Sequence, residues 1–144
     1  PSNPHLEIPF TMLTGRLTGR LAFRVDAATE FYYQWRHHNP HPMVAGPTFH
    51  VHAGGILSLP DGRELARLPL GEWVRVTVEG TFGSADAETF TLRLELPGRT
   101  EPLVFDGLRT AGKFRTMDSL FLVAQGTAHA TFEVGEITLD PAWE

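Results

Sequence analysis

The sequence contains no cysteine, no long apolar run and no excess of basic residues. Without cysteine, the chain has neither a disulfide framework nor a thiolate zinc site. No apolar run approaches the roughly 18 residues that a membrane-spanning helix needs, so we expect no membrane span. The 12 Lys and Arg are outnumbered by 17 Asp and Glu, and the net charge is −5. This balance disfavours a nucleic-acid partner, because phosphate binding needs a basic surface.

The length and composition are those of a single folded domain. Of the 144 residues, 42% are hydrophobic and 20% are charged, close to the average of globular proteins. We therefore expect residues 1–144 to form one domain with one core. Because the chain begins at Pro1 rather than Met, we also expect it to be either a segment excised from a larger multidomain protein or a processed product.

Apolar and polar residues alternate with period two in many segments, whereas helical periodicity is nearly absent. In residues 30–38, for example, Tyr33 and Trp35 share one face, and Tyr32, Gln34 and Arg36 share the other. The alternation predicts strands at 21–26, 30–38, 48–52, 56–59, 63–67, 73–79, 90–96, 103–105, 119–125 and 130–139, the last bent at Gly135. With 14 Gly and 11 Pro in the turns, this pattern predicts an all-β fold, a two-sheet antiparallel β-sandwich or jelly roll.

Residues 46–139 resemble a concanavalin A-like (laminin-G-like) jelly-roll module found in large secreted bacterial polysaccharide-active proteins. The resemblance lies mainly in turn and core positions: Gly46-Pro47, Asp61-Gly62, 69–73, Phe82-Gly83, 90–94, 96–98, 105–108, Phe114 and 117–122. It implies a carbohydrate-binding jelly roll that is secreted or on the cell surface, with the periplasm as a further location.

The same resemblance bears on calcium. Many relatives hold a structural calcium ion near the chain termini, for which Glu7, Glu136 or Asp140 could supply oxygen ligands. The module commonly ends with an aspartate in its last strand, but this chain has Gly135 and Glu136 at the corresponding place.

Residues 32–52 hold five of the seven histidines, together with several aromatic residues. In sandwiches of this type the concave sheet forms a groove, in which aromatic rings stack on sugars and polar side chains bond hydroxyl groups. The alternation gives a groove set of Arg24, Tyr32, Gln34, Arg36, His38, His50 and His52. It assigns Phe23, Tyr33, Trp35, Phe49 and Val51 to the core. Trp35 becomes the stacking platform if its strand faces the other way.

The histidines also support a second hypothesis. His50 and His52 point to the same side of a strand, and His37, His38 or His41 could complete a site for zinc, copper or another divalent ion. The alternative function is then a metal-dependent polysaccharide-active enzyme. A purely structural accessory domain is a third.

Hydrolysis without a metal has little support, since the predicted groove strands offer only Asp26 and Glu30 as carboxylates near their ends. The sequence therefore favours a non-catalytic carbohydrate-binding module over an enzyme. Its expected partners are a polysaccharide or oligosaccharide and the neighbouring domains of a parent chain. Arg24, Arg36 and the histidines suit an acidic glycan, because guanidinium pairs bidentately with carboxylate or sulfate.

Overall fold

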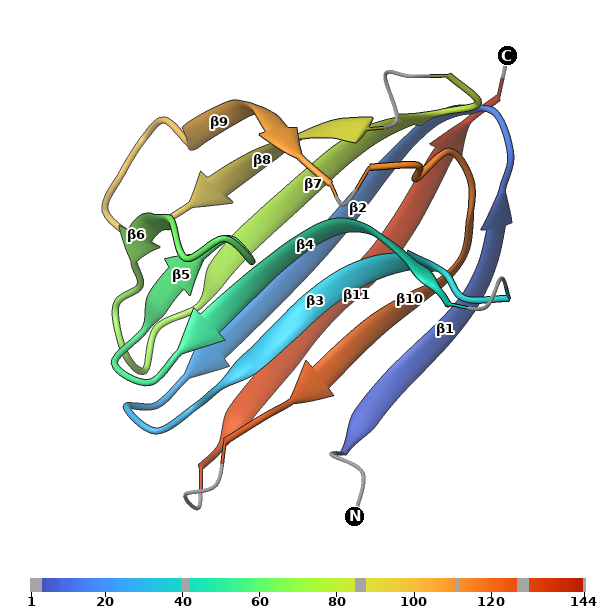
Figure 1. Ribbon diagram of the computed structural model, residues 1–144. Helices are drawn as coiled ribbons and strands as arrows, with labels where there is room; N and C mark the ends of the chain where they lie inside the picture. The colour runs from blue at the N-terminus through green and yellow to red at the C-terminus, as the bar shows by residue number, and fades with distance from the viewer. Residues whose placement is uncertain (1–3, 40–41, 85–87, 111, 127–129, 144) are drawn as a thin grey trace.

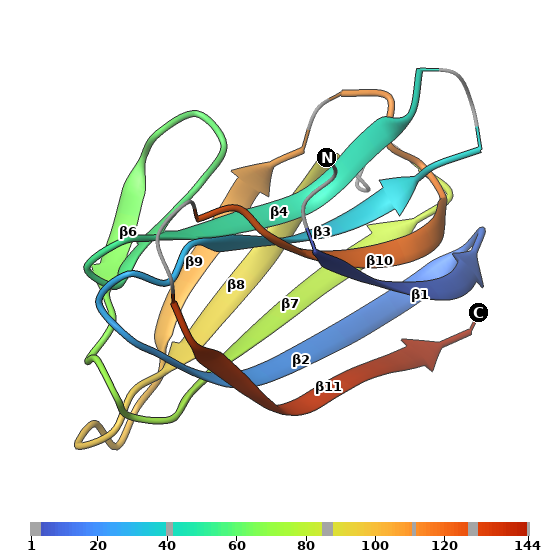
Figure 2. The same ribbon diagram turned by 90° about the horizontal axis from the view of Figure 1, so that it is seen from below.

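Two antiparallel sheets packed face to face make up the fold, which confirms the predicted all-β sandwich (Figure 1). The computed structural model describes residues 4–39, 42–84, 88–110, 112–126 and 130–143. In Figure 2 the two sheets are seen one above the other. The six-stranded sheet has the order β1 (His5–Met12), β10 (Met117–Ala124), β3 (Phe31–His37), β4 (Val44–His52), β5 (Ile56–Ser58), β6 (Glu64–Arg67). The five-stranded sheet has the order β11 (Phe132–Ala142), β2 (Gly15–Val25), β7 (Val74–Phe82), β8 (Thr89–Glu95), β9 (Leu103–Arg109).

The prediction of which side chains face the core is correct for the central strands. Side chains that alternate inward fill the space between the sheets, and their neighbours in sequence point to the outer faces. The five residues assigned to the core are at most 1% exposed: Phe23, Tyr33, Trp35, Phe49 and Val51. The residues that alternate with these five therefore lie on the outer faces of β2, β3 and β4.

Trp35 is the largest fully buried side chain, and two glycines of the opposite sheet make room for it. A Cβ atom on Gly80 would lie 2.8 Å from Trp35 Cζ3, and one on Gly19 would collide with the Tyr33 hydroxyl. Trp35 Nε1 donates a hydrogen bond to Tyr33 Oη at 2.9 Å, so the buried indole N–H is satisfied. The bulky residues of β3 and the glycines of β2 and β7 are thus complementary in shape.

The first and last strands differ most from the prediction. The sequence pattern missed β1, an edge strand that contains Pro9 and is exposed at most positions. An edge position tolerates proline, since no neighbouring strand needs its missing N–H on that side. The last strand runs from Phe132 to Ala142 rather than over 130–139, and its pairing with β2 shifts between Val134 and Glu136. This shift confirms the bend expected at Gly135, over which the Trp73 ring lies.

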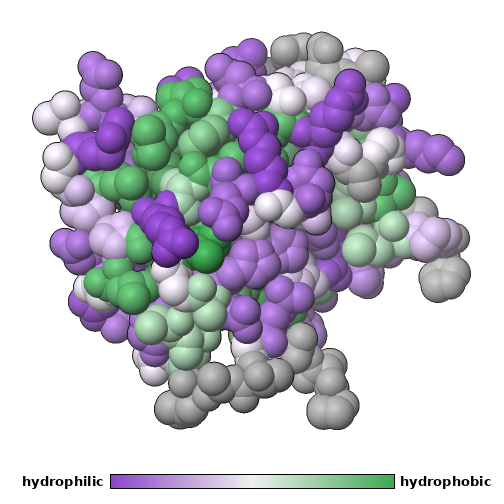
Figure 3. Space-filling model, turned by 60° about the vertical axis from the view of Figure 1, so that its left-hand side comes forward, coloured by the Kyte–Doolittle hydropathy of each residue, from purple (hydrophilic) through white to green (hydrophobic). Residues whose placement is uncertain are grey.

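Apolar side chains reach the surface where β6 and β9 end the two sheets. Figure 3 views the molecule from this side and shows hydrophobic groups gathered among hydrophilic ones. Leu65 of β6 and Leu103 and Phe105 of β9 are only partly buried, and Val104 is 42% exposed. In the part of the chain that the structure describes, no helix is long and apolar enough to cross a membrane.

Candidate functional site

Most of the predicted groove residues lie together on the outer face of the six-stranded sheet. Tyr32, Gln34 and Arg36 point outward from β3 because Tyr33 and Trp35 point into the core. On the neighbouring strand, His50 lies opposite Tyr32 in the register. His52 shares the face of His50, since the two residues are two positions apart. We call this surface the six-stranded face.

Arg36 is held in a fixed orientation at the centre of this face. Its Nε donates to Gln34 Oε1 at 2.6 Å, and its Nη2 donates to Tyr32 Oη at 2.9 Å. The guanidinium carbon lies 3.8 Å from the centroid of the Phe121 ring, a cation–π contact. These three contacts restrict a side chain that is otherwise among the most mobile.

Phe121 is a site residue that the sequence reasoning did not identify. It points to the outer face of β10 because Leu120 and Leu122 on either side face the core. Its ring is nevertheless only 5% exposed, since Arg36 covers it and the rings of His38 and His5 lie 5.4 and 5.9 Å away. The alternation of β10 could have revealed its direction, but not the neighbours that cover it.

A shallow hollow of about 430 Å³ opens above Phe121. It spans β1, β10 and β3, and its lining combines aromatic rings, a guanidinium, imidazoles and one carboxylate. The lining residues are His5, Glu7, Tyr32, Arg36, His38, Phe121 and Val123. Such a mixture of flat apolar surface with a few polar groups suits a polar ligand that also has an apolar face.

His50 and His52 form a pair of parallel imidazoles beside Tyr32. Their ring centroids are 5.7 Å apart with an interplanar angle of 3°, and the His50 ring lies 5.3 Å from that of Tyr32. The His52 Nε2 lies 2.8 Å from Ser58 Oγ on β5. Partial burial and repulsion from His52 lower the pKa of His50, although interaction with the Gln125 side chain opposes the shift. His50 is therefore neutral at pH 7 and offers one donor and one acceptor nitrogen.

The structure does not bring His37 to this pair. His37 lies on the same side of β3 as the buried Trp35, two positions away. Its Nδ1 lies 3.4 Å from Thr116 Oγ1. His41 lies outside the described residues. Among the described residues, no three His, Cys, Asp or Glu side chains lie close enough to share a metal ion.

The three calcium candidates are divided between the two sheets. Glu7 is an exposed residue of the edge strand β1. Asp140 and Glu136 lie on β11 of the other sheet, where Asp140 pairs with Arg20 at 2.8 Å and Glu136 with Arg75 at 3.2 Å. Calcium binding by any of these carboxylates stays a prediction.

One residue of the predicted groove set, Arg24, and the alternative stacking platform, Trp35, lie elsewhere. Arg24 belongs to β2 and points to the outer face of the five-stranded sheet, where it pairs with Glu133 at 2.6 Å and lies over the Trp73 ring. Its inclusion in the groove set was therefore wrong, because β2 and β3 are consecutive in sequence but belong to different sheets. Trp35 is fully buried, which removes it as a stacking platform.

Asp118 fixes the position of His38 at the rim of the hollow. Its two carboxylate oxygens accept hydrogen bonds from the backbone N–H groups of His38 and Asn39, at 2.8 and 3.0 Å, and one of them also accepts from Ser119 Oγ. Partial burial alone would raise the pKa of Asp118, but these hydrogen bonds outweigh it and lower the pKa. The carboxylate thereby ties the end of β3 to β10.

The Asp118 contacts predict acid-sensitive stability. Because the pKa of Asp118 is lower in the folded state, its ionised carboxylate stabilises the fold at pH values above the pKa that Asp118 has in the unfolded chain. This stabilisation is lost as the pH falls through the pKa that Asp118 has in the folded protein. Asp118→Asn should therefore lower the melting temperature at pH 7, and its deficit relative to wild type should shrink as the pH is lowered from 5 to 3. The exposed Glu72→Gln is the control, and a deficit independent of pH would contradict the assignment.

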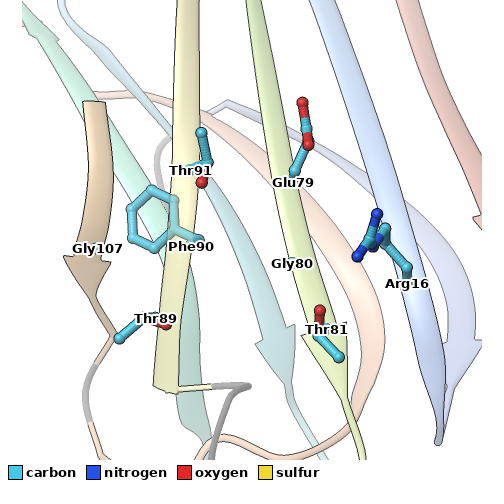
Figure 4. A pocket seen from close by; sticks show the side chains of 8 residues that line it. All are labelled: Arg16, Glu79, Gly80, Thr81, Thr89, Phe90, Thr91 and Gly107. Atoms are coloured by element: carbon cyan, nitrogen blue, oxygen red, sulfur yellow. The ribbon is translucent and has the colours of Figure 1, made fainter. Parts of the chain in front are cut away.

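The outer face of the five-stranded sheet is different in character. A hollow of about 300 Å³ there is shown in Figure 4, where Arg16, Glu79 and Thr81 lie on adjacent strands. Glu79 already pairs with Arg93 at 2.9 Å, and Thr91 donates to Asp106. Within the described residues, Arg16 makes no contact that fixes its guanidinium. Among the described residues, we therefore find no arginine on this face that a ring and neutral acceptors hold as they hold Arg36.

Known structures share the fold at low sequence identity, whereas no protein-family model and no curated protein matches the chain. Congerin II liganded with lactose and MES gives a TM-score of 0.57 at 16% identity, covering 95% of this chain and 100% of its own. The lectin UEA-II complexed with galactose gives 0.61 at 10% identity, covering 96% and 82%. SCP-B, a peptidase of the Eqolisin family in complex with a tripeptide, gives 0.53 at 9% identity, covering 99% and 81%. The chain therefore has the β-sandwich fold of these three proteins.

Proposed function

We propose that the chain is a non-catalytic carbohydrate-binding module whose ligand lies on the six-stranded face. The observation that carries the proposal is Arg36, which is stacked on Phe121 and hydrogen-bonded to Tyr32 and Gln34. A binding group fixed before the ligand arrives costs little entropy on binding. Among the described parts of the chain, we find no other arginine held by both a ring and neutral hydrogen-bond acceptors.

The other residues of this face match the chemistry of sugars. A pyranose ring has an apolar face that packs on aromatic surfaces and a rim of hydroxyl groups that donate and accept hydrogen bonds. Tyr32 supplies aromatic surface, and the neutral His50 imidazole suits hydroxyl groups. Two of the similar structures, congerin II and UEA-II, contain lactose and galactose, which supports a sugar ligand at the level of the fold.

The proposal extends to the finer assignment of the module. We place the chain among concanavalin A-like or laminin-G-like jelly rolls of secreted or cell-surface polysaccharide-active proteins, with the ligand a polysaccharide bound on the concave sheet. The hollow over Phe121 supports concavity on this side. Residues 1–144 would then be one domain of a longer parent chain.

Arg36→Ala tests the function directly. On a broad glycan array, and in affinity electrophoresis with the glycans that bind, the variant should lose about tenfold or more in affinity, since hydrogen bonds to a charged group are worth about 1.5–3 kcal/mol each. Its unfolding free energy should fall by only about 1 kcal/mol, the size of the lost cation–π contact.

The matched control is Arg93→Ala, which removes an exposed guanidinium from the five-stranded sheet. It makes the same change in net charge but lies on the opposite side of the sandwich, so glycan affinity should stay within about twofold, the size of a weak surface charge effect. Absence of any glycan hit for the wild type, or equal losses in the two variants, would count against the proposal.

A further inference from the structure

Arg36 differs in its ion pairing from most arginines on the outer face of the five-stranded sheet. On the five-stranded sheet, Arg20, Arg24, Arg75 and Arg93 each lie within 3.7 Å of a carboxylate oxygen. On the six-stranded face, Arg36 has only neutral partners and a ring, and within the described residues it forms no ion pair. A guanidinium at the centre of a sheet face without a carboxylate has its positive charge left for a ligand.

The hydrogen bonds of Arg36 also leave one edge of the guanidinium available. Gln34 and Tyr32 accept from Nε and Nη2, which lie along one side of the planar group. Within the described residues Nη1 donates to no protein atom, so the Nη1–Nη2 edge can still make two parallel hydrogen bonds. Two parallel N–H donors at this spacing match the two oxygens of a carboxylate or sulfate group.

We propose that the glycan bound by the six-stranded face is anionic and that its carboxylate or sulfate group pairs with the Nη1–Nη2 edge of Arg36. This inference rests on the proposed function and adds the chemical class of the ligand to it. The Phe121 ring lies beneath the guanidinium and the hydrogen bonds to Gln34 and Tyr32 orient it, so binding needs no rearrangement of the side chain. A neutral sugar would use single hydrogen bonds from the same edge and gain less from the positive charge.

The net charge of the chain does not itself favour an anionic glycan. At −5 the protein as a whole repels polyanions, so retention of an anionic glycan has to come from a specific site. Glu7, the carboxylate among the lining residues, lies opposite Phe121 in the register between β1 and β10. Its charge opposes an anionic ligand in the hollow, so its removal should strengthen binding.

The experiment compares glycans that differ only in charge. Comparing polygalacturonate with its methyl ester tests for recognition of a carboxylate, and comparing dextran sulfate with dextran tests for recognition of a sulfate. The broad array supplies neutral, uronate-containing and sulfated oligosaccharides. The wild type should retain at least one charged class about tenfold more strongly than its neutral counterpart, and Arg36→Ala should abolish that difference. Glu7→Gln should raise affinity for the charged member about two- to fivefold, a larger change than it makes for the neutral member.

The outcomes separate the two proposals. If only neutral glycans bind, the anionic class is wrong while carbohydrate binding stands. If no glycan of any class binds, the proposed function itself fails. If charged glycans bind but Arg93→Ala weakens them as much as Arg36→Ala, retention is general electrostatic attraction and the Arg36 site is wrong. If Arg36→Ala alone removes the preference for charge, the inference is confirmed.

Discussion

Replacing Trp35 with alanine is expected to lower the free energy of unfolding by about 3–5 kcal/mol, the usual cost of emptying an aromatic site in a core. The side chain is 0% exposed, and its ring stacks on Phe82 with a centroid distance of 5.8 Å. The variant also leaves the buried Tyr33 hydroxyl without its indole donor. Gly19 and Gly80 offer no side chains that could close the cavity, so the loss should lie at the upper end of this range.

Urea unfolding followed by circular dichroism measures this loss. Trp143→Ala is the matched control, because Trp143 is 63% exposed and the same substitution there should change stability by less than about 0.5 kcal/mol. A cost below about 1 kcal/mol for Trp35→Ala would mean that the indole does not pack between the sheets as described.

Gly80→Ala is expected to cost about 1–3 kcal/mol, although it adds one methyl group and improves strand propensity. The added Cβ would lie 2.8 Å from Trp35 Cζ3, closer than nonbonded carbon atoms approach. The two sheets would have to separate or the indole to leave its position. The physical cause is thus overpacking at a single contact.

A double-mutant cycle isolates that contact. In a Trp35→Phe background, which removes the atoms that collide, Gly80→Ala should become nearly neutral, with a coupling energy of about 0.5–3 kcal/mol. Gly126→Ala is the control for a glycine whose added Cβ would make only ordinary contacts, since the nearest atom to it is 3.5 Å away. Additive effects of Gly80→Ala and Trp35→Phe would refute the proposed collision.

The sequence pattern predicts local features of this fold well. Period-two alternation identifies which side chains of β3 and β4 face inward, because burial of one sheet face imposes that period. The placement of Tyr32, Gln34, Arg36, His50 and His52 on one face follows from it. The bend at Gly135 was predicted in the same way, from the change of phase along the last strand.

Features that depend on distant parts of the chain could not be predicted. Arg24 and Arg36 have the same alternating surroundings, yet they lie on opposite sides of the sandwich, because strand order rather than local pattern decides which sheet a strand joins. Phe121 comes to Arg36 through the pairing of β10 with β3, across more than 80 residues of sequence. The carboxylates that pair with the arginines of the five-stranded sheet come largely from β11 by the same kind of distant pairing.

The bulge at Gly135 has a consequence for how the C-terminal strand finds its place. Trp73 occupies the space above this one residue, where a Cβ atom would lie 2.9 Å from the indole. If β11 slid along β2 by two positions, a residue with a side chain would take that place and strike the ring. The observed alignment is therefore favoured over this shifted one, in which the Trp73 ring, 44% exposed, would have to move.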